Sequence, residues 1–310
     1  SSVYDPSGMR AVGVWNDEGR TVVHTGGRLI VDGVDTPFAH HESEALYVKQ
    51  PRVKGPAEVE LTAEETAFLQ ELILHRWNWA ERSGPYFVMG WLVTSMLSGA
   101  LDWRPNIWLT GPTEAGKSSV LDEILKPLIT PVGGRLFSSE TTAAGIRQDL
   151  GHSAVPVVID ELESDDDKQR RRTDDIIVMM RGSSSGSGAV VAKGTTSGTS
   201  ISYLLRSSFA MASINVGLDK AQDLNRTKVI ALNPLTAHQR SQEAETVELW
   251  EKVTPELGRK LLTKVVRLLP VIEHNAKQLK TAIIKSDSLN CGARIAKVDG
   301  LLLAGSLVFS

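Results

Sequence analysis

The feature that most restricts the fold of this chain is a glycine-rich segment that fits the pattern G-x-x-x-x-G-K-[ST] in full. It reads Gly111-Pro112-Thr113-Glu114-Ala115-Gly116-Lys117-Ser118. Two glycines let the backbone curl so that successive N–H groups point inward at phosphate, and a following helix offers its N-terminus to the same charge. A β-like run at residues 107–110 precedes the segment, and a helical run at 119–128 follows it. This order predicts a phosphate-binding loop in an α/β fold.

The chemistry of such a loop assigns roles to its polar residues and predicts ATP and Mg²⁺ as cofactors. Lys117 is expected to reach the β- and γ-phosphates, and the Ser118 hydroxyl is expected to ligate Mg²⁺. The backbone of the segment and of the adjoining Ser119 is expected to hold the phosphates. The alternative is a glycine turn that binds nothing.

An acidic element is expected at the end of a neighbouring strand. The apolar run Val155-Pro156-Val157-Val158-Ile159 is followed by Asp160 and Glu161. Asp160 is predicted to hold Mg²⁺ through water, and Glu161 to polarise an attacking water. A glutamate suited to this task favours hydrolysis over phosphoryl transfer to a small molecule. The alternative is a solvated acid pair, and Pro156 is expected at the start of the strand rather than inside it.

Changes in hydrophobic period divide the chain into four parts. Short apolar bursts between Gly and Asp turns predict strands near the N-terminus, whereas Thr62 opens a stretch of helical period with a capping pattern. Strand-like and helical runs then alternate, which is typical of a parallel sheet in an α/β layer fold. We expect a β-rich element at 1–58, a helical collar at 59–103, the α/β core at 104–235 and a helical, truncated segment at 236–310.

Composition excludes several classes of protein. The 310 residues include 34 basic and 37 acidic side chains, and this balance excludes a globally basic nucleic-acid coat. A single cysteine, Cys291, excludes a disulfide scaffold and a cysteine-based zinc site. The longest apolar run, 86–101, is interrupted and too short for a membrane helix, so no membrane partner is expected. The chain begins without methionine and ends within an apolar stretch, and we expect a fragment of a longer protein.

The stretch at about 103–234, which contains both motifs, resembles an AAA+ or superfamily-3-like helicase core. More narrowly, it is similar to the helicase part of primase–helicase proteins encoded by phages and other mobile elements. The segments that carry the likeness are 104–111, 141–148, 15–20 and 29–33. The resemblance implies an ATP-dependent DNA helicase or translocase that acts as a hexameric ring on single-stranded DNA. It also implies a location in the cytoplasm of a bacterial host and a primase domain or protein as a further partner.

The resemblance implies roles for residues beyond the two motifs. Asn215, which ends the strand-like run at 209–214, would contact the γ-phosphate or the lytic water. The runs around 189–203 predict a hairpin, and Lys193 would contact DNA from its tip. Arg226 would act on the γ-phosphate of a neighbouring subunit as an arginine finger, with Arg206 as its rival. The plainer alternatives are a strand-end turn for Asn215 and a solvated lysine for Lys193.

Other features carry less functional information. The acidic-then-basic run at 161–172 predicts a solvated loop that enters a helix. His40 and His41 lack a third ligand for a metal site. Four tryptophans near the collar are expected to pack in the core rather than stack on bases: Trp77, Trp79, Trp91 and Trp103. Two rival functions remain open, which are an ATP-switched DNA-binding initiator or loader and a small-molecule P-loop kinase.

Overall fold

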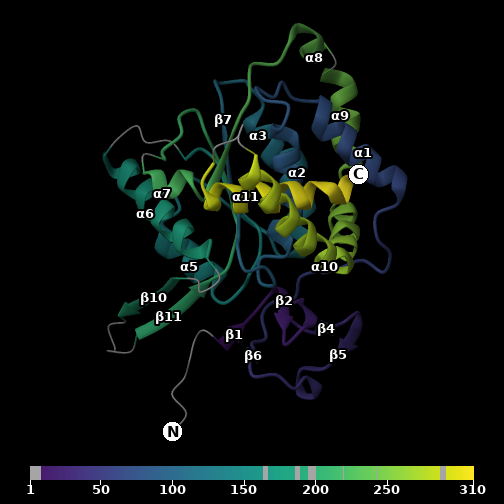
Figure 1. The fold of residues 1–310 in the computed structure, drawn as a ribbon, viewed down its shortest axis with the longest axis vertical. Coiled ribbons are helices and arrows are strands. Elements are labelled where there is room, and N and C mark those ends of the chain that lie inside the picture. The colour runs from purple at the N-terminus through teal and green to yellow at the C-terminus, as the bar shows by residue number, and fades with distance from the viewer. Residues whose placement is uncertain are drawn as a thin grey trace.

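The computed structural model describes residues 8–162, 167–185, 189–194, 200–218, 220–241, 243–286 and 291–310. An α/β core lies at the centre, a small antiparallel sheet lies at one end of the molecule, and long helices cover one side (Figure 1). The predicted fold class is therefore confirmed: a parallel sheet core with an N-terminal β-rich element, a collar and C-terminal helices.

The core sheet contains five strands in the spatial order β13-β7-β12-β9-β8, and all neighbours are parallel. The strands are β7 (Asn106–Thr110), β8 (Arg135–Phe137), β9 (Val157–Ile159), β12 (Phe209–Ser213) and β13 (Thr227–Ala231). β9 and β12 are buried along their whole length, as their unbroken apolar sequences predict for a sheet covered on both faces. Parallel strands bring their carboxyl ends to one edge, which places the phosphate loop beside Asp160.

Two local features of the core differ from what the sequence predicts. The helical run after the phosphate loop is divided into α3 (Lys117–Ser119), a wide π-type turn (Val120–Leu125) and α4 (Lys126–Ile129). Pro127 has no N–H to donate to the carbonyl of residue 123, so a regular ladder cannot run through it. The edge strand β8 was not predicted, because three residues with partly exposed side chains give no periodic signal.

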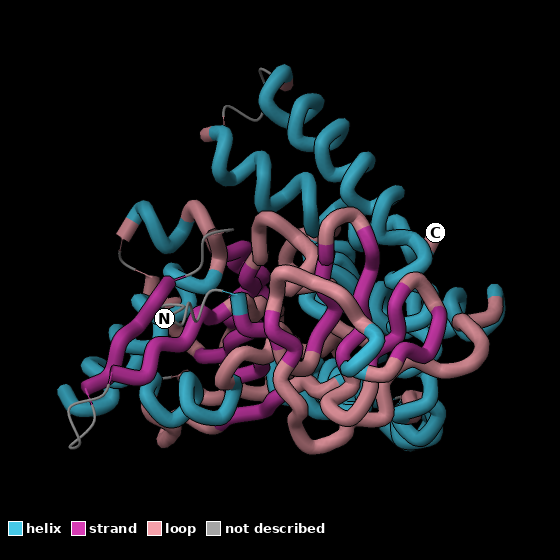
Figure 2. Tube along the Cα trace, turned by 90° about the horizontal axis from the view of Figure 1, so that it is seen from below, coloured by secondary structure: helices cyan, strands magenta, loops and turns pink. Residues whose placement is uncertain are grey.

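The helices of the collar and the C-terminal segment pack together against the core. Their bounds are α1 (Ala63–His75), α2 (Gly84–Met96), α8 (Ala237–Ser241), α9 (Glu243–Lys252), α10 (Pro255–Lys285) and α11 (Ala293–Ser306). The capping pattern at Thr62 is confirmed, since its side chain accepts from Glu65 N and Glu65 accepts from Thr62 N. Figure 2 shows α10 and α11 lying side by side as an antiparallel pair. Pro270 lies inside α10 without ending it. No helix in the described stretches is both long and apolar enough to cross a bilayer.

The N-terminal sheet is an antiparallel meander of β2 (Gly13–Asp17), β3 (Arg20–His24), β4 (Leu29–Val31) and β5 (Val34–Thr36). Beside it, β1 (Met9–Arg10) pairs in parallel with β6 (Leu46–Tyr47). Buried Asp17 accepts hydrogen bonds from Arg10 and Ser43 and lies 2.8 Å from His41 Nε2, so His41 has a structural partner. Burial lowers the pKa of His24 to about 4, which keeps that ring neutral at physiological pH.

Three helices and a hairpin complete the core: α5 (Ala143–Leu150), α6 (Asp167–Ser183), α7 (Ala221–Leu224), and the antiparallel pair β10 (Ala189–Gly194) and β11 (Ser200–Leu205). Buried Arg104 fixes the start of the hairpin, because its guanidinium donates to the carbonyl oxygens of Ser183 and Ser185. Ser183 Oγ also donates to Ser207 O and accepts from Ser207 N, which joins the two ends of the hairpin. The hairpin is thus anchored at the amino end of β12, away from the phosphate loop (Figure 1).

Candidate nucleotide-binding site

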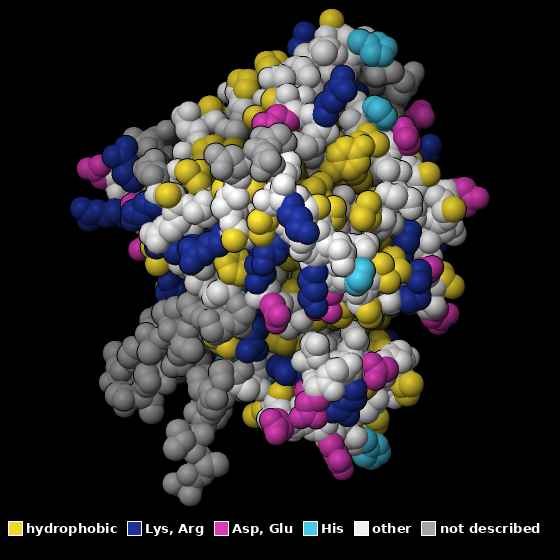
Figure 3. All heavy atoms as spheres, in the orientation of Figure 1, with side chains coloured by type: hydrophobic (Ala, Val, Ile, Leu, Met, Phe, Trp, Pro, Cys, Tyr) yellow, Lys and Arg dark blue, Asp and Glu magenta, His cyan; other side chains and the backbone are white. Residues whose placement is uncertain are grey.

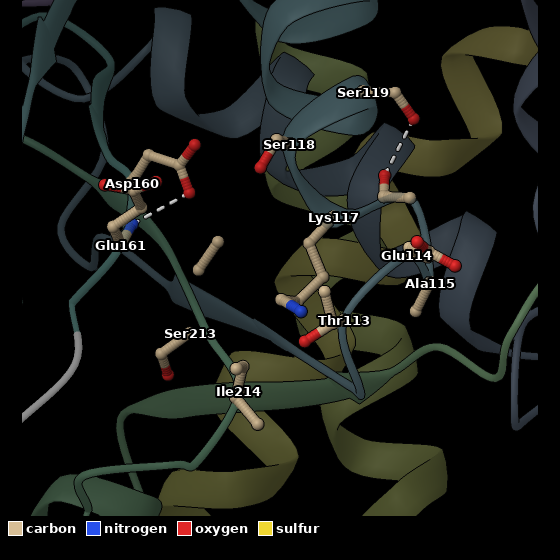
Figure 4. A pocket seen from close by; sticks show the side chains of 12 residues that line it. Thr113, Glu114, Ala115, Lys117, Ser118, Ser119, Asp160, Glu161, Ser213 and Ile214 are labelled. Atoms are coloured by element: carbon tan, nitrogen blue, oxygen red, sulfur yellow. Dashed lines mark hydrogen bonds between the residues drawn. The ribbon is translucent and has the colours of Figure 1, made fainter.

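A cavity of about 310 Å³ opens at the carboxyl edge of β7, β9 and β12. Its lining comes from three separate segments: Thr113, Glu114, Ala115, Gly116, Lys117, Ser118 and Ser119; Asp160 and Glu161; and Ala212, Ser213 and Ile214. Figure 4 shows the acid pair on one side of the cavity and the phosphate loop on the other. The fold therefore brings together the two motifs that the sequence singled out.

Both glycines of the phosphate loop are required by its geometry. Gly111 and Gly116 have φ angles of +150° and +88°, a region that favours glycine. A Cβ on Gly111 would lie 2.3 Å from Leu232 O, and one on Gly116 would lie 2.7 Å from Trp77 Cδ1. The loop is therefore enclosed from behind by Leu232, which follows β13, and by Trp77 of the collar.

Lys117 is anchored over the concave side of the loop. Its Nζ donates to Gly111 O at 2.7 Å and to Pro112 O at 3.0 Å. An ammonium group has three donors, so one N–H remains for a phosphate oxygen. The Ser118 side chain points into the same cavity, toward the side that holds Asp160 (Figure 4).

Asp160 and Glu161 form a tight, strained turn at the end of β9. Asp160 Oδ1 accepts from Glu161 N at 2.8 Å, and Glu161 has a φ of +57°, which is uncommon for a residue with a side chain. Leu162 N donates to Ala212 O, which fixes the exit of the turn against β12. Such local strain is typical of sites where side-chain direction matters. Here Asp160 and Glu161 both line the cavity.

The ligand set fits magnesium held together with a triphosphate. Mg²⁺ binds through one or two protein oxygens and completes its octahedron with waters and phosphate oxygens. Ser118 and Asp160 supply such oxygens from facing sides of the cavity. Within the described stretches there is no cluster of three or more His, Cys, Asp or Glu side chains that would hold a metal by itself. One hydroxyl and one carboxylate suit a metal that binds together with nucleotide phosphates.

Asn215 lies just beyond β12, with its side chain exposed and outside the cavity lining. The preceding residues, Ser213 and Ile214, line the cavity instead. Ser213 Oγ accepts from Trp108 Nε1 and donates to Asn215 O, so this strand end is held in place. The sensor role of Asn215 stays a prediction, and Ser213 is a lining residue that sequence reasoning missed.

The two candidate arginine fingers lie away from this chain's own cavity. Arg226 precedes β13, so it lies at the amino ends of the strands, whereas the cavity lies at their carboxyl ends. Its guanidinium donates to Gln222 O and lies 5.9 Å from the ring centroid of Trp103. Burial lowers its pKa, and nearby Arg294 and Arg181 lower it further. Arg206 follows β11 and lies 5.6 Å from the ring of Trp15. Neither arginine lines the cavity of its own chain. The arginine-finger role of Arg226 or Arg206 in a neighbouring subunit stays a prediction.

The predicted hairpin at 189–203 is present as β10 and β11, and Lys193 pairs with Ile201 in its ladder. Lys193 is the penultimate residue of β10, so its backbone lies within a strand. Residues 195–199 and the Lys193 side chain lie outside the described part of the structure. Its DNA contact stays a prediction.

Trp77 has a second role that the sequence did not indicate. Its ring is 4% exposed, as expected for core packing, but its Nε1 donates to Gly116 O and to Ser119 Oγ of the phosphate loop. No motif signals a side chain that binds a backbone carbonyl 39 residues away.

No family model matches the chain, and no curated protein sequence matches it. Among solved structures, one described as the active helicase SCCmec type IV Cch has a TM-score of 0.51 and 14% identity, over 97% of this chain and 55% of that one. The C-terminal region of NrS-1 in an apo form has a TM-score of 0.42 and 14% identity, over 80% of this chain and 64% of that one. JCV helicase bound to a small molecule has a TM-score of 0.40 and 12% identity, over 77% of this chain and 59% of that one.

The likeness to the SCCmec helicase extends over nearly the whole of this chain, and at 14% identity it shows a shared fold. This chain spans about half the length of that structure. The five-stranded parallel sheet and the phosphate loop that follows β7 agree with the α/β fold class predicted from the sequence. The chain therefore has an α/β fold of the kind found in a helicase.

Proposed function

We propose that this chain is the motor core of an ATP-dependent DNA helicase or translocase that acts as a ring on single-stranded DNA. The observation that carries the proposal is the cavity at the carboxyl edge of the sheet, where the phosphate loop faces Asp160 and Glu161. That combination suits hydrolysis, because it supplies a phosphate cradle, metal ligands and a carboxylate for water.

In this proposal each residue of the cavity has one task. The loop amides and Lys117 bind the β- and γ-phosphates, while Ser118 and Asp160 hold Mg²⁺. Glu161, which lines the cavity, accepts a proton from the attacking water. Arg226 or Arg206 of a neighbouring subunit would complete the site in a head-to-tail ring.

The core sheet offers a direct mechanical link between nucleotide and DNA. The hairpin is anchored at Ser207, two residues before β12, and the cavity residues Ser213 and Ile214 lie at the carboxyl end of the same strand. A shift at the γ-phosphate would pass along this short buried strand to the hairpin. Figure 3 shows several Lys and Arg side chains on the face of the core above the N-terminal sheet, and such positive charge suits a phosphate backbone.

The hairpin gives the DNA contact in this account. One Lys193 per subunit becomes a ring of charges matched to the phosphates of a threaded strand. The same proposal places the protein in the cytoplasm of a bacterial host, encoded by a phage or another mobile element, with a primase as a further partner. These last points rest on the sequence resemblance.

Strand separation distinguishes a helicase from an initiator or loader. We expect the wild-type chain, in a preparation shown to be ring-assembled, to displace one strand of a forked duplex with ATP and Mg²⁺. A non-hydrolysable ATP analogue should support binding to the fork without displacement, because unwinding needs repeated turnover. ATP-dependent binding with no displacement in ATP would instead identify an initiator or loader.

A further inference from the structure

Trp77 lies in the connection between α1 and α2, and its indole covers the outer side of the phosphate loop. Nε1 donates to Gly116 O at 3.1 Å and to Ser119 Oγ at 2.9 Å. The contact is close, because a Cβ on Gly116 would lie 2.9 Å from that same Nε1. A residue from the collar thus touches the loop at the residue before Lys117.

The hydrogen bond to Gly116 O controls the direction of an amide that faces the phosphates. The carbonyl of Gly116 and the N–H of Lys117 belong to one planar trans peptide, so they point in opposite directions. Trp77 Nε1, Ser119 Oγ and Val120 N all donate to this carbonyl and hold it toward the protein. The Lys117 N–H is thereby held toward the cavity, where loop amides would bind phosphate oxygens.

A second tryptophan supports Trp77 from the C-terminal segment. Trp250 of α9 stacks on it, with ring centroids 5.4 Å apart and an interplanar angle of 30°. This part of the chain is also attached to the collar by Arg76, whose Nη1 donates to Gln239 O. Trp250 and Trp77 thus form a continuous line of contacts from α9 to the phosphate loop.

We propose that Trp77 is a positioning residue of the nucleotide site, and that Trp250 holds Trp77 in place so that α9 contributes to nucleotide affinity. The inference rests on the proposed function only in that the cavity binds ATP. It assigns to the collar and the C-terminal segment a part in a site whose contact residues all come from the core.

Trp77→Phe keeps an aromatic ring but removes the Nε1 donor together with part of the indole volume, so its effect must be compared with that of another Trp-to-Phe change. Trp79→Phe is the matched control, because Trp79 belongs to the same aromatic group but its Nε1 donates to Ile73 O. We expect Trp77→Phe to weaken binding of a fluorescent ATP analogue, and to raise the KM for ATP, about fivefold, the effect of one typical hydrogen bond. The kcat should change less than the KM, and Trp79→Phe should match the wild type in both.

The role of Trp250 is tested by a double-mutant cycle. Trp250→Leu should weaken nucleotide binding about twofold to threefold, the effect of losing one aromatic pair. In a Trp77→Leu background it should have no further effect, because its influence passes through that ring. Equal affinity of Trp77→Phe and Trp79→Phe would overturn the positioning role, and an undiminished Trp250→Leu effect without Trp77 would overturn the coupling. A wild-type chain that binds no nucleotide would overturn both the inference and the proposed function.

Discussion

Replacing Lys117 with alanine should lower the rate of ATP hydrolysis on the order of a thousandfold, the effect expected when a transition-state charge loses its main partner. The lysine Nζ contacts two carbonyl oxygens of its own loop, and these oxygens remain open to solvent when the side chain is shortened. The fold should therefore survive the change. Steady-state hydrolysis at saturating ATP and Mg²⁺ measures the loss directly.

Lys126→Ala supplies the matched control for this variant. Lys126 lies in α4, and its side chain is largely exposed. It forms an ion pair with Asp122 and does not line the cavity. We expect its hydrolysis rate to stay near that of the wild type. A Lys117→Ala protein that hydrolyses ATP as fast as Lys126→Ala would show that the phosphate loop is not the site of hydrolysis.

Replacing Glu161 with glutamine should lower kcat about a hundredfold or more while leaving ATP affinity near the wild-type value. Glutamine has the shape of glutamate but cannot accept the proton of the attacking water. Glutamine and glutamate have similar backbone strain at a φ of +57°, so the turn at the end of β9 is expected to persist in the variant. Separate measurements of nucleotide affinity and single-turnover hydrolysis distinguish binding from chemistry.

Glu123→Gln removes a charge of the same kind from the helical turn behind the loop, outside the cavity lining, and should leave kcat unchanged. Glu161→Gln also differs from Lys117→Ala, because only Glu161→Gln should bind ATP without hydrolysing it. If Glu161→Gln turned over at the wild-type rate, another group would have to activate the water.

The sequence was most informative where function depends on local backbone geometry. The phosphate loop needs glycine at Gly111 and Gly116 because of their φ angles and close neighbours, and those demands appear as a fixed spacing. The acid pair at Asp160 follows a fully buried strand, so apolar continuity predicts its place at the sheet edge. These two signals predicted two of the three segments that line the cavity.

The sequence was less informative where a contact depends on tertiary packing alone. Trp77 was expected in the core, and its burial fits that expectation, but its hydrogen bonds go to backbone and hydroxyl groups that carry no pattern. β8 is too short and too exposed at Leu136 to show a period. The predicted role of Arg226 or Arg206 is a contact with the γ-phosphate bound by a neighbouring subunit. The structure of one subunit does not test that contact, so the role rests on the sequence resemblance alone.

The most direct test of the central claim is ATP hydrolysis by the ring-assembled wild-type chain, measured with and without single-stranded DNA at low salt. We expect DNA to raise the rate, because β12 joins the cavity to the hairpin, and we expect Lys193→Ala to reduce the stimulated rate. A hydrolysis rate that is the same with and without DNA in that preparation would contradict the central claim.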